Sequence, residues 1–90
     1  MTRSKTVTIC NQRGLHARAS AKFVAEAARF GARVTLSREG EEVQADSIME
    51  LLMLAAGPGA NVTITAEGED ADAALDALAA LVECGFEEND

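Results

Sequence analysis

The chain has 90 residues, of which 48% are hydrophobic and only 3% aromatic, so we expect one domain with a core of Ala, Val, Leu and Ile. Its net charge of −7 argues against nonspecific nucleic-acid binding, which needs clustered positive charge. The sequence shows no apolar run long enough to span a bilayer and no signal segment, so we expect a cytoplasmic protein that binds no membrane.

Positive and negative charges are divided between the two halves of the chain. All eight Lys and Arg residues lie in positions 1–38, where Glu26 is the only acid, and positions 39–90 hold the other fourteen acids. The first half therefore favours an anion such as phosphate, whereas the second half is expected to keep the protein soluble.

A strand and a helix are predicted in the first third of the chain. Val7 and Ile9 alternate with threonines, which is typical of a strand with one buried face, here residues 5–10. Apolar residues then recur at intervals of four, four and three, which predicts a helix from residue 16 or 17 to residue 30. Gly31 is suited to the left-handed position that commonly ends a helix.

Three further strands and two further helices follow. Alternating apolar residues predict strands at 33–38, 41–45 and 62–66. Helical spacing predicts a short helix from 47 to about 54 and a longer one from 71 to 84.

Polar residues and glycine mark the ends of these two helices. Ser47 and Glu50 fit a capping box, in which each side chain satisfies a backbone amide at the helix start. Asp70 is placed to cap the last helix and Gly85 to end it, with Phe86 folding back onto the helix.

The predicted order is β-α-β-β-α-β-α in a single domain over residues 1–90, with an acidic tail at 87–90 that we expect to fray. Each strand has one apolar face, so this is an α+β fold in which helices cover one side of the sheet and solvent the other. The element order alone also allows a ferredoxin-like split arrangement.

The segment from Asn11 to Ser20 carries the only histidine of the chain, His16, at the predicted junction of strand and helix. Amides at a helix start have no partners inside the helix and attract anions, and Arg18 adds a permanent positive charge in the same turn. A nucleophilic imidazole beside such a site suggests a histidine that accepts a phosphoryl group. The plainer interpretation is a solvated surface residue or a partial helix cap.

The string from Gly14 to Ala19, Gly-Leu-His-Ala-Arg-Ala, resembles the active-site signature of the histidine phosphocarrier (HPr) family of the phosphoenolpyruvate-dependent phosphotransferase system. That signature is usually Gly-Leu/Met-His-x-Arg-Pro, and the resemblance runs through nearly the whole chain. It implies the HPr-like two-layer open-faced sandwich, with a four-stranded antiparallel sheet of order 1-4-2-3 covered on one face by three helices.

The resemblance also implies a chemistry. His16 would receive a phosphoryl group on Nδ1 from phosphorylated Enzyme I and pass it to an acceptor of the enzyme IIA type. Arg18 matches the family arginine, and Ala17, Arg18 and Ala19 would bind the phosphate. No cofactor or metal is implied, and the protein would be a monomeric carrier with a covalent phosphohistidine rather than a stand-alone enzyme.

The resemblance assigns two roles near the second predicted helix. Ser47 matches a second phosphorylation site of many family members, the target of an HPr kinase/phosphorylase, although its role as a helix cap stands without modification. Ile48, Met49 and Leu52 match the exposed apolar patch that the family presents to its partners. The alternative is that some of these three pack in the core, as Leu51 is expected to.

Two departures from the family pattern stand out. Ala19 replaces the usual proline, which removes a fixed φ angle and restores an amide donor at the helix start. Arg13 and the closing Cys-Gly-Phe-Glu-Glu at 84–88 look more like the nitrogen-related (NPr-like) branch, which serves a regulatory phosphorelay more than sugar uptake.

Two other classes of protein remain open. An acyl carrier protein is also small and acidic and is modified on the serine of an Asp-Ser-Leu motif, to which Asp46-Ser47-Ile48 comes close. Acyl carriers are helical bundles, however, and three stretches of this chain alternate as strands do. The other alternative is a passive binding module of the same fold, in which His16 is dispensable.

Overall fold

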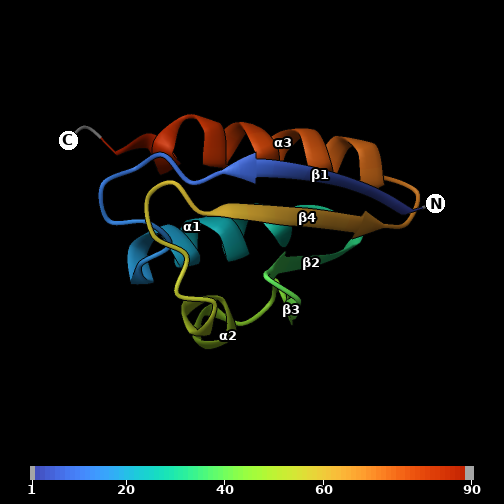
Figure 1. Ribbon diagram of the computed structural model, residues 1–90. Helices are drawn as coiled ribbons and strands as arrows, with labels where there is room; N and C mark the ends of the chain where they lie inside the picture. Colours follow the sequence, from blue (N-terminus) through green and yellow to red (C-terminus); the bar gives the residue numbers. More distant parts are fainter. Residues whose placement is uncertain (1, 89–90) are drawn as a thin grey trace.

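Four antiparallel strands form one sheet in the order β1-β4-β2-β3, and helices pack on one of its faces (Figure 1). The computed structural model describes residues 2–88. Its elements are β1 (Thr2–Thr8), α1 (Ala17–Ala27), β2 (Arg33–Arg38), β3 (Glu41–Gln44), α2 (Ile48–Met53), β4 (Asn61–Glu67), α3 (Ala71–Glu83) and a short 3-10 helix, η1 (Gly85–Glu87). The α+β open-faced sandwich with strand order 1-4-2-3 is confirmed.

The two faces of the sheet differ because side chains alternate along each strand. Leu36 of β2 and Ile64 of β4 face the helices and are fully buried, as are most of the apolar residues at alternate positions. Threonines and serines between them lie on the open face, where Thr6 and Thr63 form a cross-strand hydroxyl hydrogen bond of 3.0 Å.

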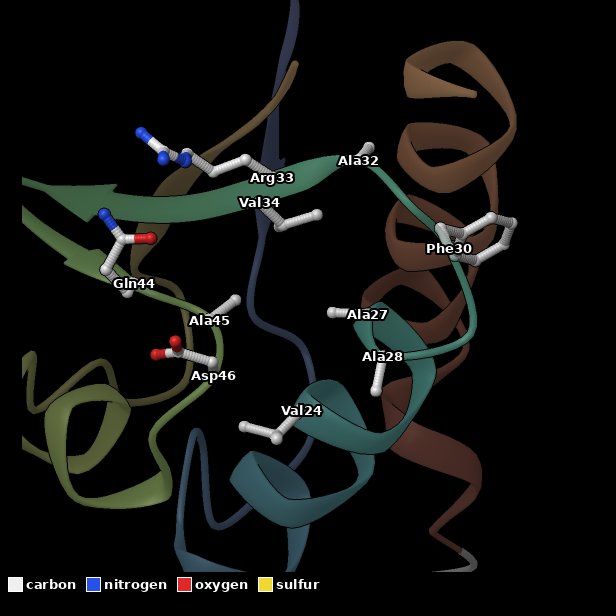
Figure 2. Close-up of a pocket in the computed structure, with 10 residues that line it drawn as sticks. All are labelled: Val24, Ala27, Ala28, Phe30, Ala32, Arg33, Val34, Gln44, Ala45 and Asp46. Carbon is white, nitrogen blue, oxygen red and sulfur yellow. The ribbon is translucent and has the colours of Figure 1, made fainter. Parts of the chain in front are cut away.

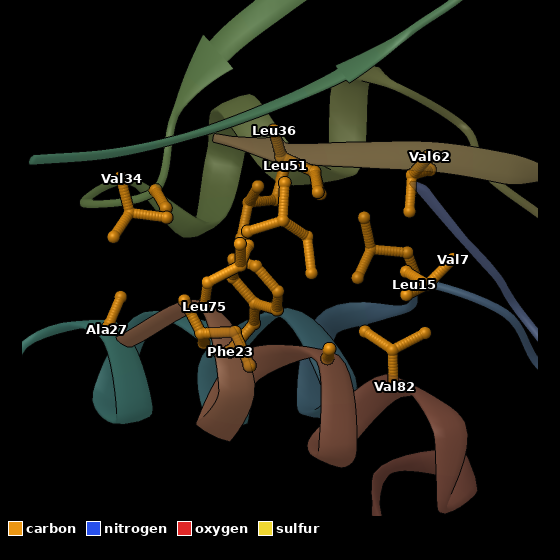
Figure 3. Close-up of a cluster of buried hydrophobic side chains, with 14 of the residues drawn as sticks. Val7, Leu15, Phe23, Ala27, Val34, Leu36, Leu51, Val62, Leu75 and Val82 are labelled. Carbon is orange, nitrogen blue, oxygen red and sulfur yellow. The ribbon is translucent and has the colours of Figure 1, made fainter. Parts of the chain in front are cut away.

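The core lies between the sheet and the helices (Figure 3). Phe23 of α1 and Leu75 of α3 approach it from the helical layer, and Leu36 and Val62 approach it from the sheet. Phe23 is wholly buried near the middle of α1, so it holds that helix against the core.

The helix α1 is shorter than its apolar pattern predicts, and the predicted cap at Gly31 is wrong. The helix ends at Ala27, and Gly31 does not adopt the left-handed conformation. Its amide instead donates a 2.7 Å hydrogen bond to Oδ2 of Asp70. Asp70 therefore makes no side-chain cap on α3, because its carboxylate is used to tie the end of α1 to the start of α3.

The capping box of α2 is only half formed. Ser47 Oγ accepts a hydrogen bond from the Glu50 amide at 3.3 Å, as predicted. The Glu50 carboxylate does not return the bond to Ser47, because it accepts one from the amide of Gln44 in β3 at 3.4 Å.

The end of the chain departs from the expectation of a frayed tail. Gly85 ends α3 in a left-handed conformation with φ +69°, as predicted, and Phe86 is fully buried. Glu88 is held by two side chains of the first loop, so the prediction of fraying fails at this residue. Residues 89–90 of the predicted tail lie outside the described part of the chain.

Within residues 2–88, no helix has both the length and the apolar content needed to cross a bilayer.

Candidate functional site

His16 occupies the N-cap position of α1. Its backbone is extended (φ −78°, ψ −178°), and its carbonyl accepts the first helical hydrogen bond, from the Ser20 amide at 2.8 Å. The ring caps the helix as well, because Nδ1 accepts a 3.2 Å hydrogen bond from the Arg18 amide. A ring nitrogen that accepts carries a lone pair rather than a proton, so a neutral ring is protonated on Nε2.

The residues before His16 are fixed by the loop that follows α2. Gly14 has φ +65°, and a Cβ atom there would lie 2.5 Å from the Ala56 carbonyl oxygen. The Leu15 amide donates a 2.8 Å hydrogen bond to that same oxygen, and the Leu15 side chain is buried. Only glycine permits both the left-handed turn and this close approach, so the loop holds His16 at the start of the helix.

The other ring nitrogen of His16 meets the far end of the chain. Nε2 is paired with Oε2 of Glu88, and the side chain of Glu88 is only 11% exposed. The second carboxylate oxygen of Glu88 accepts a 3.0 Å hydrogen bond from Asn11 Nδ2, which also donates to the Gly14 carbonyl at 2.8 Å. The hydrogen bond from His16, followed by that from Asn11, holds the pKa of Glu88 below its ordinary value of 4.5.

The three predicted phosphate-binding residues form the first turn of α1. Ala17 and Arg18 are exposed, so the Arg18 side chain lies at the surface, two residues after His16. Ala19, which replaces the usual proline, points its methyl group into the core and is fully buried. The amides of these three residues are those that an α-helix leaves without an internal partner.

The predicted partner-binding patch is exposed in the structure. Ile48 is 39%, Met49 71% and Leu52 36% exposed, whereas Leu51 is buried beneath them. Met53, at 74% exposure, extends the patch and was not singled out from the sequence. Exposed apolar and thioether side chains gathered on one short helix mark a candidate interaction surface.

Ser47 and the loop that supports the His16 segment lie at opposite ends of α2. The C-terminal end of α2 leads into the Ala56 contact with the His16 loop, whereas Ser47 caps the opposite end. Six helical residues between them span about 9 Å. The two predicted phosphorylation sites therefore share no hydrogen bond among the described residues.

Two residues at the site were not predicted. Asn11 falls within the segment chosen from the sequence but received no role, and Glu88 was placed in a frayed tail. No local pattern identifies their contact, because it joins positions 77 residues apart. The one available signal was Phe86, since a large apolar residue after a helix-ending glycine predicts that the chain stays packed there.

The hollow shown in Figure 2 lies elsewhere on the molecule. It opens between the C-terminal end of α1 and the residues that join β3 to α2, with Val24, Phe30 and Asp46 among its lining side chains. His16 does not line it. Among residues 2–88, no group of three His, Cys, Asp or Glu side chains is arranged to hold a metal ion.

Comparisons with known proteins agree on one family. A family model described as "PTS HPr component phosphorylation site" matches residues 3–84. Phosphocarrier protein NPr of Shewanella violacea is 46% identical over 93% of this chain and 92% of its own length. Phosphocarrier protein HPr of Cupriavidus necator is 48% identical over 96% of this chain and 97% of its own length.

Solved structures give the same result. HPr-C-His from Thermoanaerobacter tengcongensis superposes with a TM-score of 0.92 at 37% identity, covering 97% of this chain and 98% of that chain. HPr from Bacillus anthracis superposes with a TM-score of 0.86 at 47% identity, covering 90% of this chain and 96% of that chain.

Proposed function

The chain belongs to the HPr family of phosphocarrier proteins of the phosphotransferase system, and on that premise we propose that His16 carries the phosphoryl group on Nδ1. It receives the group from phosphorylated Enzyme I and passes it to an acceptor of the enzyme IIA type. The observation that carries the proposal is the Nδ1 lone pair, which points at the open start of α1 next to Arg18.

The transfer needs a nucleophile and a place for the phosphate. Nδ1 attacks phosphorus, the new N–P bond forms, and the bond between phosphorus and the donor breaks with its electron pair remaining on the donor. Before the reaction the Arg18 amide donates a hydrogen bond to Nδ1. Once Nδ1 has bonded to phosphorus, that amide is free to donate to a phosphoryl oxygen. The amides of Ala17 and Ala19 and the Arg18 guanidinium supply further positive potential for the bound phosphate.

Partner recognition is assigned to the patch of Ile48, Met49, Leu52 and Met53. These exposed side chains belong to the helix whose following loop contacts the His16 loop, so a partner seated on them would reach the phosphate. Flexible methionines suit a surface that must fit two different partners in turn. The carrier acts as a monomer in the cytoplasm.

Ser47 is proposed as a second, regulatory phosphorylation site for an HPr kinase/phosphorylase. A phosphate there would meet helix-start amides, which favour it, but also the carboxylates of Asp46 and Glu50, which do not. The cap that Ser47 provides does not depend on this modification.

The pathway is proposed as the nitrogen-related phosphorelay rather than sugar uptake. Arg13 and the closing residues at 84–88 support this branch, as does the NPr of Shewanella violacea among the relatives. The acyl-carrier alternative is wrong, because acyl carriers are helical bundles and this chain forms a four-stranded sheet.

The function is tested by incubating the protein with Enzyme I and phosphoenolpyruvate. We expect intact mass and ³¹P NMR to detect one acid-labile phosphate on the wild type and none on His16→Ala. Arg18→Ala should still fold, because Arg18 is exposed, but should accept the group about tenfold more slowly through loss of a charge-assisted hydrogen bond.

A wild-type chain that takes no phosphate from a competent cognate Enzyme I would leave the passive binding module as the function. An unchanged transfer rate for Arg18→Ala would remove only the role assigned to Arg18.

A further inference from the structure

We propose that Glu88 is a positioning residue for His16, presented by the C-terminal turn so that its carboxylate holds the Nε2 proton and leaves Nδ1 as the nucleophile. The inference rests on the proposed phosphocarrier function and adds a residue that lies beyond positions 3–84, the part of the chain that the family model matches.

The first support is the geometry of the carboxylate. Its two oxygens have different partners, because Oε2 is paired with His16 Nε2 and Oε1 accepts from Asn11 Nδ2 at 3.0 Å. Asn11 is itself buried, with 6% exposure, and is anchored to the Gly14 carbonyl. The carboxylate is thus fixed from one side by a buried amide, and the imidazole meets it on the other.

The second support is the way in which the chain brings Glu88 to this place. Gly85, Phe86 and Glu87 adopt left-handed conformations in succession, with φ of +69°, +57° and +62°. Two of these residues carry a Cβ atom, for which this region is unfavourable, and such conformations persist only where surrounding contacts impose them.

Those contacts are present in the C-terminal turn. Phe86 is fully buried, and its carbonyl accepts a 2.7 Å hydrogen bond from Lys22 Nζ of α1. The Glu88 amide donates to the Gly85 carbonyl at 3.1 Å and closes the turn. The strained backbone is held by these contacts and ends at a side chain that touches the proposed nucleophile. We therefore interpret the contact between Glu88 and His16 as a specific one rather than as an accident of a loose segment.

The carboxylate would act at two stages of the transfer. Before the reaction it accepts a hydrogen bond from Nε2–H and so selects the tautomer whose lone pair is on Nδ1. As Nδ1 bonds to phosphorus, the ring gains positive charge, and the Glu88 carboxylate opposite stabilises it. The proton stays on Nε2 throughout, so when the group moves on, the N–P electrons return to Nδ1 and the neutral ring is restored.

The test compares Glu88→Gln and Glu88→Ala with Glu87→Gln. Glu88→Gln keeps the shape and removes the charge, whereas Glu88→Ala also removes the acceptor. Glu87 is the matched control, because it is exposed, one residue away, and the same substitution removes the same charge. Nitrogen-15 NMR of the imidazole reports the tautomer without any partner protein, and transfer from Enzyme I reports the rate.

We expect the wild type and Glu87→Gln to show the Nε2–H tautomer of His16 and equal transfer rates. Glu88→Ala should show a mixture of tautomers, and both Glu88 variants should accept the phosphoryl group about tenfold more slowly, as for the loss of one charge-assisted hydrogen bond to the reacting ring. Amide spectra should show that all variants keep the fold.

A wild type that is phosphorylated on His16, with Glu88 variants that match it in tautomer and rate, would overturn the inference and leave the proposed function intact. Faster transfer in the Glu88 variants would also overturn it, because the turn would then obstruct the ring. A wild type that takes no phosphate would overturn the proposed function, and the inference with it.

Discussion

His16 uses both ring nitrogens within the chain, and the two contacts are of different kinds. Nδ1 accepts a hydrogen bond from a backbone amide of α1, the element next to it in sequence, whereas Nε2 is paired with the carboxylate of Glu88, 72 positions away. The ring is therefore oriented before any partner arrives. Orientation of this kind lowers the entropic cost of bringing the reacting atoms into line.

The pairing of Glu88 with His16 predicts how its carboxyl group titrates. The hydrogen bond from His16, followed by that from Asn11, keeps the pKa of Glu88 below 4.5. Because the folded-state pKa is depressed, the stability contributed by this pair is fully present above about pH 4.5 and is lost as the pH falls through the lowered value.

Carbon-13 NMR of the Glu88 carboxyl group measures this directly. We expect a midpoint below 4.5 in the wild type and a return toward 4.5 in His16→Ala, since the largest cause of the shift is then absent. A wild-type midpoint at or above 4.5 would contradict the pairing.

At the scale of elements, the turn before α1 and the loop after α2 form one support for the site. Gly14 makes this support possible, because its left-handed backbone lies against the backbone of Ala56 and Gly57. The support is rigid because its contacts are backbone to backbone and cannot move aside as a flexible side chain would.

Gly14→Ala should therefore lower the free energy of unfolding by about 2–4 kcal/mol, combining the cost of a left-handed alanine with that of overpacking. Chemical denaturation measures the loss. Gly40→Ala is the matched control, because Gly40 is also left-handed (φ +87°) but has no atom within 4 Å of an added Cβ. Equal losses in the two variants would show that the Ala56 contact is not restrictive.

Most elements could be predicted from the sequence, because their periodicity reflects burial on one face of a sheet or helix. Periodicity could not predict the contacts that a single polar side chain makes with a distant part of the chain. The Asp70 carboxylate reaches Gly31 across 39 positions, and Glu88 reaches Asn11 across 77, so no window of local sequence contains either pair. His16 and Arg18 could be singled out from the sequence because the helix start at which they lie is a local feature.

At the scale of the whole molecule, the basic and acidic halves of the sequence do not form separate faces. Arg3 and Lys5 of β1 pair with Asp72 and Glu83 of α3 at 3.1 and 4.0 Å. These pairs are exposed and each contributes little to stability. They neutralise basic side chains of β1 at the edge of the sheet. The exposed apolar patch on α2 therefore differs more from the rest of the surface than this edge does.

Met49→Asp tests this surface. Met49 is 71% exposed, so the variant should keep the stability of the wild type while its affinity for Enzyme I falls about tenfold or more, because a charge would be placed in an apolar interface. Isothermal titration calorimetry and thermal unfolding measure the two quantities.

Leu51→Asp, at a buried position on the same helix, should instead unfold the protein. Unfolding of Met49→Asp would place Met49 in the core, and unchanged affinity would move the partner surface elsewhere.

The closure of the C-terminal turn onto the first loop also has a consequence for synthesis. A ribosome makes Asn11 and His16 early, but the carboxylate that meets them follows 77 and 72 positions later. A nascent chain can form the strand and loop that carry the histidine, yet its ring remains without its second contact until residue 88 has been made.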